Sequence, residues 1–187
     1  MPWEARIKGK LRPLPGGTAP PQPHEPLSSV LALLGVETDT QEEKILLMKR
    51  TMDVVTHKGQ VSFPGGYYEP QDPSLLATAL RETWEEIGMR SEHIRVLGGL
   101  SPIQTLGDVW IYPWVGEMTF PYPFALNPTE VDRLLFLPVR RLLEEGLKPV
   151  TVPIEGRKVK SIGIELDGEL VWGATAKMLE ELRQLLL

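Results

Sequence analysis

The sequence predicts an α+β domain with mixed sheets and flanking helices, because strand-like runs outnumber helical ones. The two strongest helical patterns cover residues 73–87, in the middle of the chain, and residues 175–187, at its end. No internal repeat breaks this order. A length of 187 residues indicates one domain, since about 100–200 residues is usual for one.

The N-terminal part differs in composition. Residues 1–12 are mixed and predict a short helix or an arm. Between Pro13 and Pro26 six of fourteen residues are proline, which excludes a regular helix or a central strand. We expect residues 1–27 to form a proline-rich arm, packed on the domain or on a second subunit, with a disordered linker as the alternative. Residues 28–187 then form the domain.

Strands are expected wherever apolar residues run together or alternate with polar ones. These runs cover residues 29–36, 44–50, 60–63, 94–103, 109–118, 150–154, 159–166 and 170–172. Pro113 marks its run as a bulged or edge strand. Asp167-Gly168 is a hairpin turn signal, and Gly146 closes a short helix over 139–145.

The helix over 73–87 carries start and stop signals. Asp72 is the expected N-cap, Pro73 takes the first helical position and Gly88 ends the helix. The expected buried face, at spacings of three and four, consists of Leu76, Ala79, Leu80, Thr83 and Ile87.

Three glutamates share one face near the end of this helix: Glu82, Glu85 and Glu86. Like charges at this spacing repel one another and cost stability, so we expect a cation beside them. Carboxylates offer only hard oxygen ligands, which suit Mg²⁺ or Mn²⁺.

Composition excludes several classes of protein. The absence of cysteine excludes disulfides, a cysteine nucleophile and thiolate metal sites, and it is compatible with a reducing cytoplasm. No apolar run approaches the ~20 residues of a membrane span, and the N-terminus lacks a signal-peptide core. The net charge of −5 argues against broad nucleic-acid binding, which depends on many Lys and Arg contacts to phosphate. We expect a soluble cytoplasmic protein.

The stretch 65–89 resembles the Nudix box of the Nudix hydrolases. That pattern reads Gly, five residues, Glu, seven residues, Arg-Glu, an apolar residue, any, Glu-Glu, any, Gly, apolar. The second half fits, with Thr83 in the apolar slot. In the first half Asp72 stands for Glu, and eight residues rather than seven separate it from Arg81.

The resemblance implies a Nudix-type α/β/α sandwich with a mixed sheet, a catalytic loop-helix-loop and a C-terminal helix. It implies that Glu82, Glu85 and Glu86, with Gly66, hold the divalent ions. Glu82, Glu86 and Arg81 are the catalytic candidates, Glu82 also as the base. Arg81 orients the glutamates, the alternative being an ordinary surface ion pair with Glu85.

The segment before the box resembles the extra motif of coenzyme A pyrophosphatases, which Arg50 and residues 63–66 match. Thr51 stands where Ser or Ala is usual, and Val55 stands where a second arginine belongs. His57 matches a histidine common in this branch, and a surface loop residue is the alternative.

An anionic substrate must approach an anionic box, so local cations are expected to help it. Arg50, Lys58 and Arg81 are these cations. Gly65 lets the backbone come close to the substrate. The predicted substrate-binding residues are therefore Arg50, His57, Lys58 and Gly65.

Two later segments resemble the same branch. Residues 127–131 resemble its Asn-Pro-any-Glu-Val segment, and residues 172–176 resemble its Trp-Gly-any-Thr-Ala entry to the last helix. Glu130 is a further catalytic candidate, because a carboxylate outside the box often acts as ligand or base in Nudix enzymes. The alternative is that Asn127 or Thr129 caps a helix with Glu130 in its first turn.

Four tryptophans lie within expected elements, at positions 84, 110, 114 and 172. An indole ring carries a large apolar surface, so core or sheet packing is expected for most of them rather than base stacking. Trp3 is left unplaced by the pattern.

The resemblance predicts a Mg²⁺- or Mn²⁺-dependent pyrophosphohydrolase that cleaves coenzyme A, or a derivative, to 3',5'-ADP and 4'-phosphopantetheine. Val55 leaves open another nucleoside diphosphate derivative, such as ADP-ribose, NADH or a dinucleoside polyphosphate. A Nudix-fold nucleotide-binding module without turnover is the alternative from a different class. The proline-rich arm suggests an exchanged contact in a homodimer.

Overall fold

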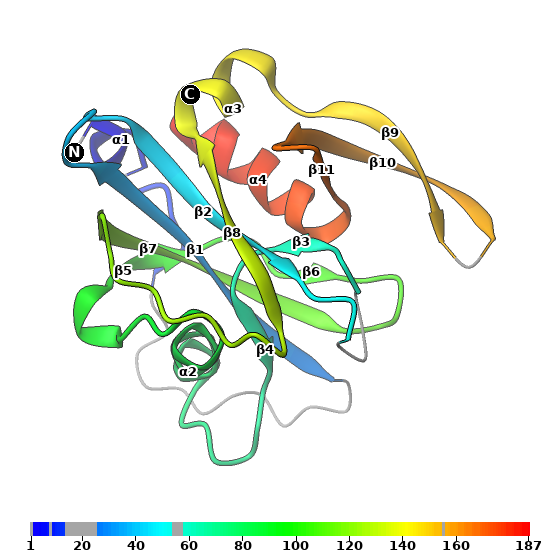
Figure 1. Cartoon of the computed structure of the whole chain (residues 1–187), viewed down its shortest axis with the longest axis horizontal. Coiled ribbons are helices and arrows are strands. Elements are labelled where there is room, and N and C mark those ends of the chain that lie inside the picture. The colour runs from blue at the N-terminus through cyan, green and yellow to red at the C-terminus, as the bar shows by residue number, and fades with distance from the viewer. Residues whose placement is uncertain (1, 8, 14–25, 54–57, 155) are drawn as a thin grey trace.

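The computed structural model describes residues 2–7, 9–13, 26–53, 58–154 and 156–187 (Figure 1). The helices are α1 (Pro2–Ile7), α2 (Leu75–Ile87), the 3-10 helix η1 (Ser91–His93), α3 (Val139–Glu145) and α4 (Gly173–Leu186). The strands are β1 (Leu27–Glu37), β2 (Glu43–Arg50), β3 (Val61–Ser62), β4 (Gly65–Tyr67), β5 (Arg95–Gly99), β6 (Ile103–Gln104), β7 (Trp110–Phe120), β8 (Val131–Pro138), β9 (Lys148–Ile154), β10 (Arg157–Leu166) and β11 (Glu169–Trp172). The predicted α+β class with a mixed sheet and a C-terminal helix is confirmed.

The larger sheet is built around β1. One edge of β1 pairs in parallel with β7 along its whole length, and the other edge pairs antiparallel with β4 and then β2. In the described part of the chain eight strands join this sheet, in the order β3-β2-β1-β7-β5 with β4 beside β1, β6 beside β7 and β8 beside β2. The segment from β3 to β4 therefore crosses from β2 to β1, and this crossing carries the glycine pair of the box.

Two apolar clusters lie on the two faces of this sheet. Val30, Ala32 and Leu34 of β1 belong to the cluster that packs against α1, α3 and α4, whereas Leu31 and Leu33 belong to the cluster under α2. Figure 1 shows α2 on one side of the sheet and α4 with α1 on the other. This is the expected helix-sheet-helix sandwich. None of the described helices is long and apolar enough to span a membrane.

The smaller sheet, in the order β11-β10-β9, extends beyond α4 (Figure 1). The hairpin predicted at Asp167-Gly168 is present, and both residues have positive φ, 50° and 80°. The helix predicted over 139–145 is present with Gly146 after it.

The expectation that Pro113 marks a bulged or edge strand is wrong, because β7 lies inside the sheet between β1 and β5. The register shift falls in β5, between Val96 and Gly98. Strand β5 pairs as far as Trp114, and β6 begins to pair at Ile111. The missing N–H of Pro113 therefore falls in the gap between two partner strands, where no ladder bond requires it.

The N-terminal helix belongs to the domain core. Trp3 is fully buried and Ile7 is 1% exposed, both in the α4-side cluster. The backbone N–H of Trp3 donates to Glu43 Oε1 at 2.8 Å. The predicted boundary after residue 27 therefore places Trp3 and Ile7, two side chains of the domain core, in the arm. Most of the proline-rich stretch, 14–25, lies outside the described residues, so the arm and its dimer contact stay predictions.

The prediction that most of the tryptophans pack in the core or sheet agrees with Trp114, which is 6% exposed, and with Trp110, which packs against the α2-side cluster, whereas Trp84 is 50% exposed. Trp84 lies one turn after Leu80, which is only partly buried against the α2-side cluster, and its own ring is open to solvent. Its position within a helical pattern did not distinguish a solvent-facing residue from a core one.

Trp3→Ala should lower the free energy of unfolding by about 3–5 kcal/mol, because it leaves a cavity in the α4-side cluster. Urea denaturation of the two proteins measures this loss. Trp84→Ala is the matched control and should change the value by about 0.5 kcal/mol or less, as exposed sites do. Equal losses in the two variants would contradict the assignment of α1 to the core.

Candidate active site

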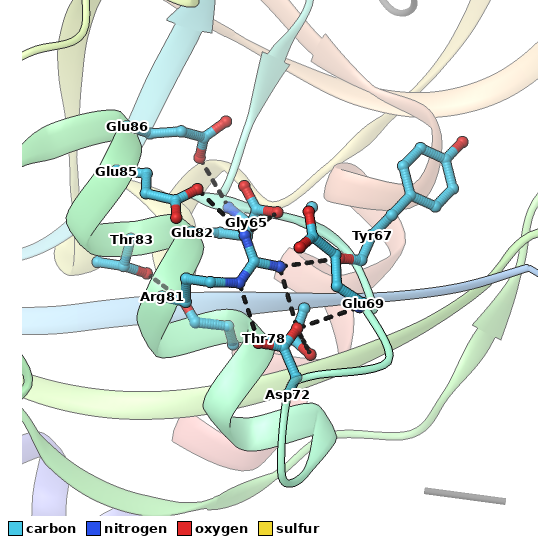
Figure 2. Close-up of polar contacts among 12 residues, drawn as sticks. Gly65, Tyr67, Glu69, Asp72, Thr78, Arg81, Glu82, Thr83, Glu85 and Glu86 are labelled. Atoms are coloured by element: carbon cyan, nitrogen blue, oxygen red, sulfur yellow. Dashed lines mark hydrogen bonds and ion pairs between the residues drawn. The ribbon is translucent and has the colours of Figure 1, made fainter.

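Helix α2 and the β3–β4 crossing bring the box residues together (Figure 2). Gly65 donates its N–H to Glu86 Oε2 at 2.9 Å. A Cβ atom on Gly66 would lie 2.4 Å from the Glu82 carboxylate. Glu85 is half exposed and reaches Arg81 at 3.1 Å. The predicted glutamates and both glycines therefore share one site.

Glu86 is the most deeply buried of these carboxylates, at 1% exposure. Its Oε1 accepts a 2.9 Å bond from Arg50 Nη1, while Gly65 holds the other oxygen. Burial raises the pKa of Glu86 to about 8, although the Gly65 N–H and the Arg50 charge oppose the rise. The nearby charges of Glu82 and Glu130 add to it.

Arg81 contacts four groups of the box. Its Nη1 donates to Glu82 at 2.9 Å and to Glu85 at 3.1 Å, and its Nη2 donates to the Tyr67 carbonyl at 3.1 Å. The Nε and Nη2 atoms also donate to the two oxygens of Asp72, each at 3.0 Å. Hydrogen bonding to Asp72 holds the pKa of Arg81 above its ordinary value. Arg81 thus contacts both glutamates, not a single surface partner.

The prediction that Asp72 caps α2 is wrong. Ser74 is the N-cap, and its hydroxyl accepts from the Ala77 N–H at 3.1 Å. The Asp72 carboxylate instead accepts from Arg81, from Thr78 Oγ1 and from the Glu69 N–H. Burial would raise the pKa of Asp72, but these hydrogen bonds outweigh it and hold the pKa below its usual value. Helix α2 therefore starts at Leu75, later than expected.

Other features of the helix prediction hold in part. Gly88 ends α2 with φ 69°, and its N–H donates to the Trp84 carbonyl at 2.9 Å. Thr83 fits the apolar slot of the box because its hydroxyl donates to the Ala79 carbonyl at 2.6 Å. The buried face consists of Leu75, Thr78, Ala79, Thr83, Glu86 and Ile87, whereas the predicted Leu76 and Leu80 are half buried.

Glu82 lies between Arg81 and the glycine pair. Burial raises the pKa of Glu82, and the Arg81 charge and hydrogen bond oppose that rise. The charges of Glu85 and Glu130 act in the same direction as burial. Glu130 therefore acts electrostatically on both Glu82 and Glu86.

Glu130 lies beside this cluster, in a turn and not in a helix. The helix-cap alternative is wrong, because β8 begins at Val131. Asn127 Nδ2 donates to Glu130 Oε1 at 3.1 Å, and the Asn127 N–H donates to the Glu86 carbonyl at 2.8 Å. This contact was not predicted from the sequence, although Asn-Pro tends to start a turn that the Asn side chain closes.

The remaining predicted residues lie away from these contacts or outside the described part. Lys58 is exposed in the turn before β3. His57 lies outside the described residues, as does Val55. The Gly66 carbonyl, a predicted metal ligand, accepts a 2.9 Å bond from Ser28 Oγ and has a second lone pair available.

The chemical type of the candidate ligands suits a hard divalent cation. These ligands are carboxylate and carbonyl oxygens. Burial raises the pKa of Glu82 and of Glu86, so their charged forms are disfavoured without a cation beside them. No three acidic, histidine or cysteine side chains among the described residues converge on one point. Glu86 is paired with Arg50, and Glu82 is paired with Arg81.

Comparison with protein families agrees with this geometry. The family described as NUDIX domain matches residues 29–152. The chain therefore belongs to the NUDIX family, and it is a Nudix hydrolase, a pyrophosphohydrolase. Divalent metals and nucleoside diphosphate substrates are typical of this class.

Relatives of known sequence and structure support the assignment. The chain is 33% identical over 141 residues to "Uncharacterized Nudix hydrolase NudL" of Photorhabdus laumondii, covering 75% of each chain. The protein of that name in Yersinia pestis is 33% identical over 144 residues, or 76% of this chain and 72% of the relative. A MutT/nudix family protein from Enterococcus faecalis has a TM-score of 0.55 at 17% identity, covering 88% of this chain and 63% of that one. A C. elegans Ap4A hydrolase binary complex has a TM-score of 0.52 at 14% identity, covering 63% and 83%. Both structures confirm the fold.

The metal-free protein should lose stability as the pH rises from about 5 to about 8. The folded state keeps a proton on Glu86 that the unfolded chain has already released, so the contribution is complete below pH 4.5 and is lost through pH 8. One effective pKa unit corresponds to about 1.4 kcal/mol, or ~3–5 °C for a chain of this size. Thermal melting in EDTA across this range measures it.

Glu86→Gln should flatten this dependence, because glutamine has no proton to lose there. Glu144→Gln, in an exposed ion pair on α3, is the control and should leave the slope unchanged. An unchanged slope in Glu86→Gln would show that Glu86 does not carry the effect.

Gly66→Ala should lower kcat/KM by about 100-fold, because the new Cβ displaces the Glu82 carboxylate. The backbone of Gly66 has no positive φ, and the clash is with the end of a flexible side chain, so the fold should persist. Steady-state kinetics and thermal melting separate the two effects. Gly107→Ala, whose new Cβ would have its nearest neighbour at 4.0 Å, should retain full activity.

Proposed function

We propose that this Nudix hydrolase cleaves the diphosphate of coenzyme A, or of a close derivative, to 3',5'-ADP and 4'-phosphopantetheine, with Mg²⁺ or Mn²⁺. The observation that supports it best is the contact between two separate motifs. Arg50, from the segment that resembles coenzyme A pyrophosphatases, donates to Glu86 of the Nudix box at 2.9 Å. A residue of the substrate-type motif thereby adjoins the catalytic carboxylates.

Arg50 also has a donor to spare. Its Nε is buried and has no hydrogen-bond partner among the described residues. A buried N–H without a partner costs roughly 1–3 kcal/mol, so a site that keeps one gains when an acceptor arrives. A phosphate oxygen of the substrate is such an acceptor, and His57, Lys58 and Gly65 are the further substrate-binding candidates.

The proposed metal site consists of Glu82, Glu85, Glu86 and the Gly66 carbonyl. An ion held there supplies charge neutralisation at the diphosphate and acidifies a bound water. Arg81 keeps Glu82 and Glu85 oriented toward one another. Burial of Glu86 excludes bulk water from that end of the site.

The reaction needs one proton acceptor from the chain. Water attacks one phosphorus and its proton passes to a carboxylate. The bond from that phosphorus to the bridging oxygen, on the side opposite the water, breaks. The leaving fragment carries the bridging oxygen as a phosphate. Glu82 and Glu130 are the candidate acceptors, because both lie beside Glu86. No covalent enzyme intermediate is required.

A second candidate substrate is another nucleoside diphosphate derivative, such as ADP-ribose, NADH or a dinucleoside polyphosphate. Val55 favours it, because it removes a cation that the coenzyme A motif has at that position. A binding module without turnover is disfavoured because Glu82, Glu85 and Glu86 are all present.

A panel of coenzyme A, ADP-ribose, NADH and diadenosine tetraphosphate, each with Mg²⁺ or Mn²⁺, should give the highest kcat/KM with coenzyme A. Release of 3',5'-ADP, resolved by chromatography, identifies the cleaved bond. Glu86→Gln should lower kcat by at least about 100-fold on any substrate, since it removes a buried anionic ligand. Glu144→Gln again serves as the control.

The outcomes separate the claims. A higher kcat/KM for another diphosphate would overturn the coenzyme A assignment and leave the hydrolase intact. Tight diphosphate binding without products at saturating Mn²⁺ would instead support the binding module.

A further inference from the structure

We propose that Asn127 is a positioning residue that fixes the Glu130 carboxylate beside Glu86 for its part in the reaction. The inference rests on the proposed role of Glu130. It gives a role to Asn127, which lies outside the Nudix box.

The orientation of the Asn127 amide is set by its neighbours. The backbone N–H of Thr129 faces one side-chain atom of Asn127 at 3.2 Å, and an N–H can only donate. That atom is therefore Oδ1, which also accepts from Thr129 Oγ1 at 2.8 Å. The other side-chain atom must be Nδ2, which donates to Glu130 Oε1 at 3.1 Å.

The backbone of Asn127 connects the same turn to the catalytic helix. Its N–H donates to the Glu86 carbonyl at 2.8 Å, and its carbonyl accepts from the N–H groups of Glu130 and Val131 at 3.1 and 2.9 Å. One residue thus contacts Glu86 through its main chain and the Glu130 carboxylate through its side chain.

The end of strand β2 and Thr51, the residue after it, complete the network from the other side. Thr51 donates its N–H to the Glu130 carbonyl and its hydroxyl to the Thr129 carbonyl, both at 2.9 Å. The neighbouring Arg50 donates to Glu86 at 2.9 Å. The ring runs from Glu86 through Arg50, Thr51 and Glu130 to Asn127 and back to Glu86. A side chain held within a closed ring has few alternative positions.

The chemical character of the donor distinguishes Glu130 from the box glutamates. Glu82 and Glu86 each contact an arginine, which fixes them and also cancels charge. Asn127 is neutral, so it fixes the Glu130 carboxylate without cancelling its charge. The bond occupies Oε1, and within the described residues no hydrogen bond is made to Oε2. That oxygen is left to accept the proton of the attacking water.

Four variants test the proposal by kcat, KM and metal-free thermal melting. Asn127→Ala removes the donor without adding charge, and Asn127→Asp retains the Oδ1 acceptor while replacing the donor. Both should lower kcat by about 10- to 100-fold with KM within about threefold, the range for partners that orient catalytic ligands. Thr129→Ala is the control: it removes the hydroxyl bond to Asn127 Oδ1 and keeps the bond from the backbone N–H. It should lower the melting temperature by the loss of one local hydrogen bond and leave kcat within about twofold of wild type. Glu130→Gln should lower kcat at least as far as Asn127→Ala.

The double variant Asn127→Ala with Glu130→Gln decides whether Asn127 acts through Glu130. If it does, the double variant should have the kcat of Glu130→Gln alone, because coupled groups are not additive. If the double variant's loss in kcat is instead the product of the two single-variant losses, the proposal is overturned. Equal kcat losses in Thr129→Ala and Asn127→Ala would also overturn it. Full activity in Glu130→Gln would instead overturn the proposed role of Glu130. Those outcomes are distinct, so each claim fails on its own result.

Discussion

The contact on which the site depends is the burial of the Glu86 carboxylate against the Gly65 N–H and Arg50. A buried carboxylate is costly unless hydrogen bonds and opposite charge compensate it. Here one backbone N–H and one guanidinium compensate in part, and the pKa of Glu86 still rises to about 8. In the metal-free fold this carboxyl therefore keeps its proton up to about pH 8, because burial disfavours its anionic form. A site of that kind has a thermodynamic reason to bind a cation.

Gly65 can donate its N–H to Glu86 because of where the chain crosses the sheet. Strand β1 offers one edge to β4 and then to β2, and the β3–β4 segment passes from one partner to the other. Gly65 adopts φ 150° at this point, and a Cβ there would lie 2.3 Å from the Ser29 carbonyl. Only glycine allows the backbone to lie so close to β1 while its N–H faces α2. The sheet topology therefore determines which residue can contact Glu86.

Much of the fold and of the box could be predicted from the sequence, because their signals are local. Apolar periodicity identified most of the strands and the long helices, and Gly146 and Asp167-Gly168 marked a helix end and a hairpin turn. Strands β4 and β8 were not predicted. The misses have a common cause in distant partners. Asp72 has the composition of an N-cap, but Arg81, nine residues later, takes its carboxylate. Pro113 is permitted inside the sheet by a gap between two other strands, and Trp3 is buried by helices from the far end of the chain.

The carboxylates of this site differ in their partners, and that difference divides their chemistry. Arg81 makes two bonds to Asp72, which hold its guanidinium in place. From that fixed position it contacts Glu82 and Glu85 and orients both carboxylates. Arg50 faces Glu86 from β2 with one N–H still unpaired within the described residues. Glu130 is the exception, since the contact to its side chain comes from the neutral amide of Asn127. Arginines therefore contact the carboxylates proposed to hold metal, whereas an uncharged donor contacts Glu130. An arginine partner favours the charged form of a carboxylate and so opposes protonation, which makes Glu130 the better suited of the two candidate proton acceptors.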